Sequence, residues 1–503
     1  MRKYSIQIIL PAALLAMFGV WRAVAPPAQS ATPIHSALPD PSKAKLALNS
    51  MIRHREWVQV STESGGVLAF VVYPERSDKA PVVIVRDAQN GASDWARATA
   101  DQAAAEGFIA VVPDVLTGTG PRGGDTDSFA TPAEVTAALD KMGPQEIARR
   151  VEAVRSYSLA LAAANGTSAD LNLDARHRRI GAAVHLPSGK SRTANFELTA
   201  WPGAVTFLNR ETDNRPVIGT NANAPEDHSA HIAMLMGQMV AGHGAPGVGI
   251  GSKQPHLPAG YFTAQSTLAN SKQQKEWVDI PMGDVKLHTW IEYPSGKEKA
   301  PIAIVMQHAT GVDDWLRAVA NQLAVQGFIA VTPDIWSGAG PNGGNREAFQ
   351  YVDDAMKATA KISADETQRR FKAAWDYAIK LPRSNGKGAS IGFCAGGGSS
   401  FRFAAEVPEL GAAVVFYGTP PTEAQMAKIK APVIGFYGEN DARVTSTVEP
   451  TIAAMKRLGK VYEPHVYPKA THTFVMFQEI AGNPAAVSDS WPRAIAFMNQ
   501  YTR

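Results

Sequence analysis

The chain has 503 residues, of which 45% are hydrophobic and 19% are charged, so it is long enough for two globular domains. Its composition shows neither a disordered nor a collagen-like bias. The 49 Lys and Arg residues nearly balance the 46 Asp and Glu residues, and the formal net charge is +3. Because no run of basic residues forms a polybasic patch, nucleic acid is not expected as a partner.

The N-terminal segment differs in character from the rest of the chain. Two basic residues precede an apolar stretch at about residues 6–20, and small residues and prolines follow it. This order predicts a secretory signal peptide over residues 1–30, cut before Ala31 or Pro26. An uncleaved membrane anchor is the alternative, although the apolar stretch is short for a spanning helix. We therefore expect a secreted or periplasmic protein that meets a membrane only if this segment stays attached.

An internal repeat organises the remainder of the chain. Residues 81–124 align without gaps with residues 301–344, and 23 of the 44 aligned positions are identical. The spacing of 220 residues suits one duplicated α/β domain better than a solenoid repeat. We expect a linker at 31–54, a first copy at 55–262, a second linker at 263–276 and a second copy at 277–503.

Each copy shows the same alternation of strand and helix patterns in chain order. A short strand is followed by an apolar run, as expected for a strand buried on both faces, and then by a helix and a further buried strand. Such alternation predicts an α/β fold, with a mostly parallel sheet covered by helices in each copy. The expected strands are 67–73, 81–85 and 108–112 with a helix at 94–106, and 285–293, 301–305 and 328–332 with a helix at 314–326.

The second copy contains a candidate nucleophile in a turn between a strand and a helix. A strand pattern leads into Gly-Phe-Cys-Ala-Gly at 392–396, and a helical pattern follows at 400–407. This is the nucleophile-elbow form Gly-x-Nuc-x-Gly, with Cys394 as the nucleophile. Side chains at the two glycines would collide with the neighbouring strand and helix, and the helix N-terminus favours the reactive thiolate. The chain has one cysteine, so no internal disulfide explains it, and a buried inert cysteine is the alternative.

An acid and a histidine follow the cysteine in the order that such hydrolases use. Asp441 lies just beyond a predicted buried strand, where ligand-facing residues of such sheets are found, and Glu439 is the alternative acid. His472 falls in the loop after the last predicted strand, which is the position of the general base. His465 is its rival, but it lies inside that strand.

These residue types predict a division of labour. His472 would take the proton of Cys394 and later activate water, while Asp441 would fix the imidazole tautomer. The backbone N–H groups of Ala395 and Ala309 would hold the oxyanion.

The second copy resembles the dienelactone hydrolase family of α/β-hydrolases over about residues 277–501. The motifs that carry the resemblance are Ser-Asn-Gly-Lys at 384–387, Gly-Phe-Cys-Ala-Gly-Gly at 392–397, Gly-Glu-Asn-Asp at 438–441 and Ala-Thr-His-Thr-Phe at 470–474. The resemblance implies two tandem α/β-hydrolase domains and the same three triad residues. It also implies cleavage of a small-molecule lactone, ester or thioester without a cofactor or metal.

Two positions depart from the family pattern and belong to the expected substrate pocket. His308 stands where family members that take dienelactone often have a Glu in the oxyanion-side loop. Met476 stands where they have an Arg that binds the substrate carboxylate, and a guanidinium is not replaced conservatively there. The expected substrate therefore shifts away from dienelactone, although Arg346 could still supply a positive charge.

The first copy is expected to have lost this chemistry. Alignment with the second copy places Ala183 opposite Cys394, Pro225 opposite Asp441 and His256 opposite His472, so at most one triad residue survives. Glu226 and Asp227 lie beside the acid position, but an acid and a base without a nucleophile cannot carry out acyl transfer. We expect this copy to keep the scaffold and to pack on the active copy, shape its entrance or bind something unrelated.

The sequence also allows two other hypotheses about the function of the whole chain. One is a non-catalytic binding or scaffold protein built from two hydrolase-like domains. The other is a hydrolase of peptides or amides, since Cys–His sites cleave those bonds too. The sequence does not specify the oligomeric state.

Overall fold

The structure is a computed structural model, and it describes residues 41–49, 51, 53–62, 65–174, 179–185, 191–197, 254–296, 298–478, 480 and 482–503. The described residues belong to one compact unit. The predicted signal peptide at 1–30 and the positions Pro225, Glu226 and Asp227 lie outside the described residues. None of the helices in the described part of the chain has the length and apolar character that a membrane crossing needs.

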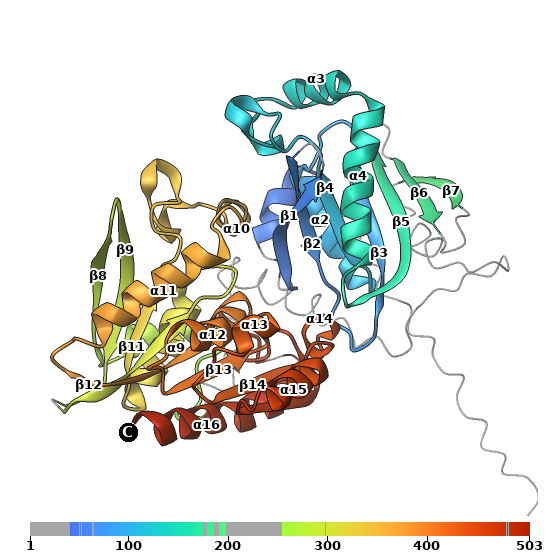
Figure 1. Ribbon diagram of the computed structural model, residues 1–503. Coiled ribbons are helices and arrows are strands. Elements are labelled where there is room, and N and C mark those ends of the chain that lie inside the picture. The colour runs from blue at the N-terminus through green and yellow to red at the C-terminus, as the bar shows by residue number, and fades with distance from the viewer. Residues whose placement is uncertain are drawn as a thin grey trace, which may run out of the picture. The chain divides into compact units, whose positions relative to one another are not determined.

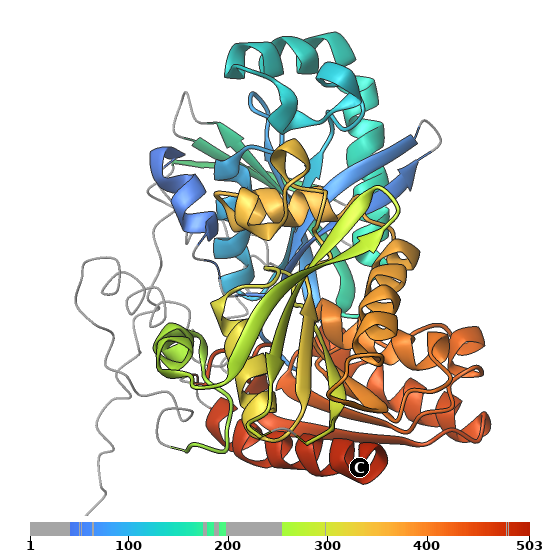
Figure 2. The ribbon, with the colours of Figure 1, turned by 90° about the vertical axis from the view of Figure 1, so that its left-hand side faces the viewer.

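The second copy contains an eight-stranded sheet that is mostly parallel (Figure 1). Its strand order is β15-β14-β13-β12-β10-β11-β9-β8, and only β9 and β8 run antiparallel to their neighbours. The β8–β9 hairpin forms one edge of the sheet (Figure 2). The strands are β8 (Gln274–Met282), β9 (Val285–Tyr293), β10 (Ala300–Met306), β11 (Ile329–Pro333), β12 (Ser384–Phe393), β13 (Ala412–Phe416), β14 (Val433–Asn440) and β15 (Tyr462–Thr471).

Helices cover both faces of this sheet because its parallel strands are apolar on both sides. In β10 the buried side chains alternate, so that Val305 packs with one cluster and Ile304 with the other. The first cluster lies under α9 (Asp314–Val325) and α16 (Asn483–Thr502). The second lies under α11 (Ala364–Ala378), α12 (Ala395–Glu406) and α15 (Val448–Arg457). Shorter helices are η5 (Tyr261–Thr263), α8 (Ala264–Asn270), η6 (Pro341–Gly343), η7 (Arg346–Ala348), α10 (Val352–Thr359), α13 (Glu423–Met426) and α14 (Ala442–Thr445).

The first copy contains a seven-stranded mixed sheet in the order β1-β2-β4-β3-β5-β6-β7. Only β4, β3 and β5 pair in parallel, and the other described pairings are antiparallel. The strands are β1 (Arg55–Thr62), β2 (Gly65–Val72), β3 (Ala80–Asp87), β4 (Ile109–Asp114), β5 (Ala164–Asp174), β6 (Arg179–His185) and β7 (Ser191–Glu197). The helices are η1 (Pro41–Lys43), α1 (Ala44–Asn49), α2 (Asp94–Ala105), η2 (Pro121–Gly123), η3 (Thr126–Ser128), α3 (Pro132–Met142) and α4 (Pro144–Leu159).

The strand registers of the two copies repeat at the spacing of 220 residues. Val82 of β3 lies opposite Ser168 of β5, and Ile302 of β10 lies opposite Gly388 of β12. Strand β5 therefore occupies in the first sheet the place that β12 occupies in the second. The duplication seen in the sequence thus extends to the pairing of the central strands.

This register corrects the predicted counterpart of the cysteine. At a spacing of 220 residues, the position that matches Cys394 is Asp174 at the end of β5, and the assignment to Ala183 was wrong. After Cys394 the chain enters α12, whereas after β5 it returns as the antiparallel strand β6. The first copy therefore lacks both the cysteine and the helix that would complete an elbow at this point.

A group of charges, most of them buried, joins the two copies. Lys357 of α10 lies 2.8 Å from Asp127, 3.1 Å from Asp114 and 3.1 Å from Asp125, all of the first copy. Its ammonium also lies 4.6 Å from the ring centre of Trp57. The first copy thus packs directly on the second, and the ion pairs of Lys357 form part of this contact.

Candidate active site

Cys394 lies at the turn between β12 and α12, in a backbone conformation that L-residues rarely adopt. Its φ is 57° and its ψ is −117°. Non-glycine residues hold such angles only where the surrounding structure fixes them, and they are frequent in active sites. Here the Cys394 N–H donates to the carbonyl oxygen of Phe416 at 3.0 Å, which ties the turn to the neighbouring strand.

The two glycines that flank the cysteine allow this turn to form. A Cβ atom at Gly392 would overlap the carbonyl oxygen of Gly396 in the helix. A Cβ atom at Gly396 would overlap the carbonyl oxygen of Met306 at the end of β10. The steric reason for both glycines, expected from the sequence, is confirmed.

Asp441 and His472 meet at the ends of neighbouring strands. Asp441 follows β14 and His472 follows β15, and these strands pair in parallel. The His472 Nδ1 and Asp441 Oδ2 atoms are 2.5 Å apart, and the two side chains are 3% and 5% exposed. The other ring nitrogen, Nε2, is buried and has no hydrogen-bond partner among the described residues. It remains available on the side where Cys394 lies, with the reacting atoms of the two residues within 4.8 Å.

The two alternative residues have other partners. Glu439 accepts a hydrogen bond from the Lys469 N–H at 2.9 Å. His465 pairs with Glu463 at 2.8 Å on the outer part of β15. Neither lies among the residues that line the cavity at Cys394.

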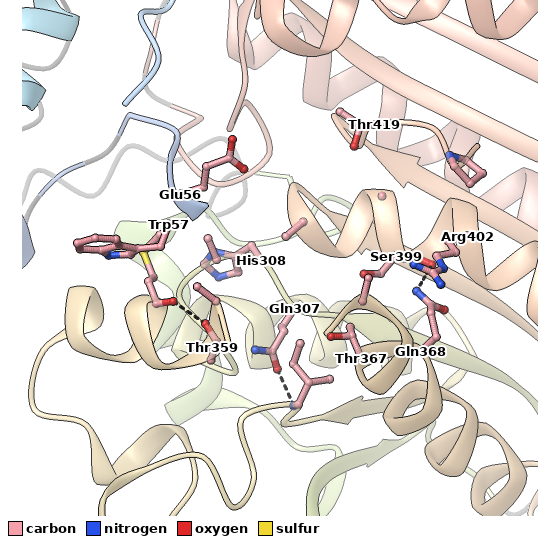
Figure 3. Close-up of a pocket in the computed structure, with 18 of the residues that line it drawn as sticks. Glu56, Trp57, Gln307, His308, Thr359, Thr367, Gln368, Ser399, Arg402 and Thr419 are labelled. Atoms are coloured by element: carbon pink, nitrogen blue, oxygen red, sulfur yellow. Dashed lines mark hydrogen bonds between the residues drawn. The ribbon is translucent and has the colours of Figure 1, made fainter. Parts of the chain in front are cut away.

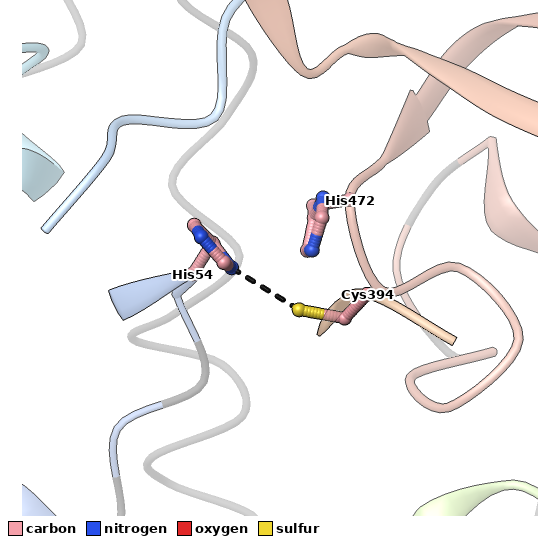
Figure 4. Close-up of side chains that lie close together, drawn as sticks. All are labelled: His54, Cys394 and His472. Atoms are coloured by element: carbon pink, nitrogen blue, oxygen red, sulfur yellow. Dashed lines mark hydrogen bonds between the residues drawn. The ribbon is translucent and has the colours of Figure 1, made fainter. Parts of the chain in front are cut away.

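A second histidine, which the sequence did not predict, contacts the cysteine from the first copy. His54 Nδ1 lies 3.4 Å from Cys394 Sγ (Figure 4). Its side chain is 8% exposed, and its ring centre lies 4.4 Å from that of His472. In the sequence His54 is the last residue of the predicted linker, and it carries no local motif. The contact joins residues 340 positions apart, so no pattern near either residue indicates it.

An acid lies behind this second histidine. His54 Nε2 is 3.8 Å from Glu56 Oε2, and Glu56 Oε1 accepts a hydrogen bond from the Tyr73 hydroxyl at 2.8 Å. Burial opposes ionisation of Glu56, but His54, Arg443 and the Tyr73 hydroxyl outweigh it and lower its pKa to about 2. Glu56 is therefore a carboxylate at neutral pH.

The charges around Cys394 favour an ion pair. Burial alone would raise the pKa of the thiol, but His54 and His472 outweigh this and lower it well below its ordinary value. Burial opposes protonation of His472, yet the charges of Asp441 and Cys394 raise its pKa to about 9. At neutral pH the site therefore favours a thiolate beside an imidazolium.

The two alanines whose N–H groups are expected to bind the oxyanion line the same groove. Ala395 is the first residue of α12, so its N–H has no carbonyl partner within the helix. Ala309 follows His308 in a turn that closes with a 3.1 Å hydrogen bond from the Gly311 N–H to the His308 carbonyl. Both alanines line a groove of about 510 Å³.

The groove and a smaller cavity draw residues from both copies. Figure 3 shows Glu56 and Trp57 of the first copy on one side of the groove and Ser399 and Arg402 of the second copy on the other. A cavity of about 70 Å³ lies at the cysteine itself. Its lining comes from the second copy and from the segment before β1: Met51, Arg53, His54, Arg55, His308, Ala309, Thr310, Trp315, Met356, Cys394, Tyr417, His472, Thr473, Met476 and Phe477.

The two residues expected in the substrate pocket both line this cavity. His308 is 7% exposed, and its Nε2 lies 3.2 Å from Asp313 Oδ2. Met476 is 6% exposed. Arg346, considered as a source of positive charge, donates from Nε to the Thr310 carbonyl at 2.7 Å and lines a neighbouring cavity instead.

A guanidinium from the first copy reaches the cavity that Met476 lines. Arg55 is 5% exposed, and its Nη1 donates to the Met51 carbonyl at 2.8 Å. Its Nε has no hydrogen-bond partner, and no carboxylate among the described residues lies within ion-pair distance. No pattern in the sequence indicated this residue, because it too comes from the other copy.

The histidine assigned to the triad position of the first copy lies elsewhere. The His256 carbonyl accepts a hydrogen bond from Gln326 Nε2 at 3.0 Å, beyond the end of α9. The segment that follows it packs on the second copy, where Trp315 Nε1 donates to the Ala259 carbonyl at 3.1 Å. His256 is not part of the cluster around Cys394.

The three side chains at the centre could also serve as metal ligands. The potential donor atoms of His54, Cys394 and His472 lie within 4.8 Å of one another. A thiolate with two imidazoles is a donor set that suits Zn²⁺ or copper. Within the described part of the chain, this is the group of His, Cys and acidic residues close enough for such a role.

Comparison with known proteins identifies one family. A model of the Dienelactone hydrolase family matches residues 67–168 and 287–502. A "Putative carboxymethylenebutenolidase" from Saccharolobus solfataricus is 25% identical over 248 residues, which are 43% of this chain and 95% of that protein. A protein of the same name from Salmonella typhimurium is 27% identical over 263 residues, 49% of this chain and 90% of its own.

Solved structures are also similar to part of this chain. A "Putative Dienelactone Hydrolase" from Klebsiella pneumoniae is 25% identical with a TM-score of 0.41, and covers 46% of this chain and 99% of its own. The dienelactone hydrolase from Anabaena variabilis is 20% identical with a TM-score of 0.37, and covers 46% of this chain and 100% of its own. Each of these relatives matches slightly less than half of this chain.

Proposed function

Because the chain belongs to the dienelactone hydrolase family, whose members are hydrolases, we propose that it cleaves a carboxylic ester, lactone or thioester with Cys394 as the nucleophile. The observation that carries the proposal is the buried His472–Asp441 pair beside a cysteine held at the strained turn. The groups needed for acyl transfer, a nucleophile, a base and an orienting acid, are then present without a cofactor.

In the first half of the reaction the Cys394 thiolate attacks the carbonyl carbon and forms a C–S bond. The negative charge that develops on the carbonyl oxygen would be held by the N–H groups of Ala395 and Ala309. When the tetrahedral intermediate collapses, the C–O bond of the ester breaks. The leaving alkoxide takes the proton of the His472 imidazolium.

In the second half water releases the acyl group. Formation of the thioester removes the negative charge of Cys394, which had helped to raise the pKa of His472. The neutral imidazole can then take a proton from water while Asp441 holds its tautomer. Addition of hydroxide and loss of the thiolate complete the cycle and release the carboxylic acid.

The charge of Arg55 bears on the substrate. A buried guanidinium without a carboxylate partner is costly, and an anionic ligand offsets that cost. We therefore favour substrates that carry a negative charge near the scissile bond. Recognition would differ from the family pattern, since the guanidinium comes from the other copy.

The test is a comparison of the full chain with Cys394→Ala on chromogenic esters, thioesters and lactones. The variant should lose at least about a thousandfold in kcat/KM. A thioester adduct on Cys394, trapped by acid quenching and seen by mass spectrometry, would locate the nucleophile. Equal hydrolysis by the wild type and the variant would contradict the proposal. If neither the wild type nor the variant hydrolyses any substrate, the hypothesis of a binding or scaffold protein is favoured.

We further propose that the protein works outside the cytoplasm, on the pattern of residues 1–30. The intact mass of protein recovered from the periplasm or medium tests this. A mass that starts at Ala31 or Pro26 is expected, and an uncut chain in the cytoplasmic fraction would contradict it.

A further inference from the structure

Cys394 is flanked by two imidazoles, one from each copy. His472 belongs to the second copy and pairs with Asp441 at 2.5 Å. His54 directly precedes β1 of the first copy, is counted with that copy, and contacts the sulfur at 3.4 Å. The two rings lie 4.4 Å apart at an angle of 57°, so each approaches the sulfur from its own direction (Figure 4).

We propose that His54 is a second catalytic histidine, which donates a hydrogen bond from Nδ1 to the Cys394 thiolate and stabilises it as nucleophile and as leaving group. Glu56 is its positioning residue. This inference rests on the proposed acyl transfer at Cys394. It gives the first copy, which lacks its own nucleophile, a direct part in the reaction.

Each ring nitrogen of His54 faces a different group. Its Nε2 faces the Glu56 carboxylate at 3.8 Å, and its Nδ1 faces the sulfur. The Tyr73 hydroxyl holds that carboxylate at 2.8 Å. A carboxylate behind an imidazole fixes the ring and stabilises the imidazolium, in which the nitrogen that points to the reacting atom also carries a proton. The His54–Glu56 contact of 3.8 Å is longer than the 2.5 Å His472–Asp441 hydrogen bond, so Glu56 acts on His54 through its charge.

The second copy provides an internal comparison for this arrangement. Its Tyr293 hydroxyl donates to Glu276 at 2.8 Å, as Tyr73 does to Glu56 220 positions earlier. The tyrosine–glutamate pair is therefore a shared feature of the two sheets. The residue 220 positions after His54 is Gln274, so the imidazole is particular to the first copy. His54→Gln consequently places a residue there that this fold already accommodates.

The charges at the site agree with the proposal. Burial raises the pKa of the Cys394 thiol, and the charge of His54 is the first of the opposing causes, followed by the charge of His472. Removing His54 should therefore move the titration of the sulfur toward its ordinary range. The other charged and titratable groups around the cluster are Arg53, Arg55, Glu56, Tyr73, His308, Tyr417, Asp441 and Arg443.

The bond changes follow from this placement. In acylation the sulfur lone pair forms the C–S bond and the hydrogen bond from His54 is released. In deacylation the C–S bond breaks and its electron pair returns to sulfur, where the His54 N–H receives it again. His472 carries the proton to the leaving alkoxide and from the attacking water. Water is consumed, an acid and an alcohol are formed, and no other reactant is needed.

The experiment compares the full chain with His54→Gln and with the control His465→Gln, whose imidazole pairs with Glu463 away from the sulfur. Alkylation of Cys394 by iodoacetamide is followed from pH 5 to pH 10 (about one point per half unit) alongside kcat and KM for an ester. His54→Gln should slow alkylation at pH 6 by about tenfold or more and lower kcat by about tenfold or more with a smaller change in KM. His465→Gln should match the wild type in both.

Three further results decide the proposal. Glu56→Gln leaves the sulfur contact in place and should shift the alkylation profile in the same direction by a smaller amount, which tests the link even if His54→Gln does not fold. An unchanged alkylation profile and kcat in folded His54→Gln would overturn the proposal. So would an equimolar metal ion in the purified protein whose removal abolishes activity, because His54 would then be a ligand. A wild type that is inactive on every ester would instead refute the proposed function. The alkylation assay needs no ester, so it still tests the contact between His54 and Cys394 in that case.

Discussion

Lys357 of the second copy and Asp114 of the first copy form a 3.1 Å ion pair in which the two side chains are 7% and 0% exposed. Lys357 directly follows Met356, which is a lining residue of the cavity at Cys394. Lys357, which joins the two copies, is thus adjacent in sequence to Met356, which lines the site. Its loss should affect stability and, through the placement of the first copy, activity.

The first prediction concerns that pair. Lys357→Met removes one cation from three carboxylates, and a buried charge left without its partner costs about 3–5 kcal/mol. We expect a fall of this order in the free energy of unfolding, measured by urea denaturation. Lys361→Met, which removes an exposed lysine one turn further along the chain, should change it by less than about 0.5 kcal/mol. Equal stability of the two variants would contradict the stabilising role of the Lys357 ion pairs.

The second prediction concerns pH. The pKa of Cys394 is lowered, so its thiolate persists as the pH falls below the ordinary thiol range and is lost only on passing the lowered value. The pKa of His472 is raised to about 9, so its imidazolium is lost as the pH rises through that value. The rate of acylation should therefore be flat around neutrality and fall above about pH 9 because the leaving alkoxide loses its proton donor. Single-turnover kinetics measure this, and a rate that rises steadily through pH 9 would contradict the ion pair.

The third prediction concerns the glycines of the turn. A methyl group at Gly396 would overlap the Met306 carbonyl oxygen, whereas one at Gly398 would lie 3.3 Å from its nearest neighbour, the Thr419 carbonyl oxygen. Gly396→Ala should abolish ester hydrolysis and lower Tm, because α12 must move away from β10 to admit the methyl group. Gly398→Ala should have a much smaller effect on both. The comparison fails if the two variants behave alike.

The fourth prediction concerns substrate charge. Arg55→Met removes the unpaired guanidinium beside Met476, and KM for esters with a carboxylate near the scissile bond should rise about tenfold or more. KM for neutral esters of the same size should change little. Arg55→Lys keeps the charge but not the fork geometry, so its KM for the anionic esters should lie between those of the wild type and Arg55→Met. An equal rise for anionic and neutral esters would point to a packing role for Arg55.

Local patterns predicted the second copy well. The elbow, the acid and the histidine each follow a strand, and strand ends are marked in the sequence by apolar runs and glycine-containing turns. Parallel strands then bring their carboxyl ends to the same edge, which is why residues as far apart as Cys394 and His472 meet. His308 and Met476 line the cavity for the same reason.

Other features could not be read from local patterns. The place of Ala183 was assigned from a short apolar match, and pairing between strands, which decides the true counterpart, has no signal within one segment. His54 and Arg55 reach the site because two sheets pack together across several hundred residues. That packing depends on buried contacts such as those of Lys357, whose partners are spread along the first copy.

The His54–Cys394 contact ties the histories of the two halves together. After duplication, a copy without a nucleophile would ordinarily be free to change or to disappear. If His54 acts as proposed, a substitution at the residue just before β1 would alter the chemistry of the other half. The proposed role of His54 would make the two halves one unit under natural selection, in which the first half is retained for what it gives to its neighbour.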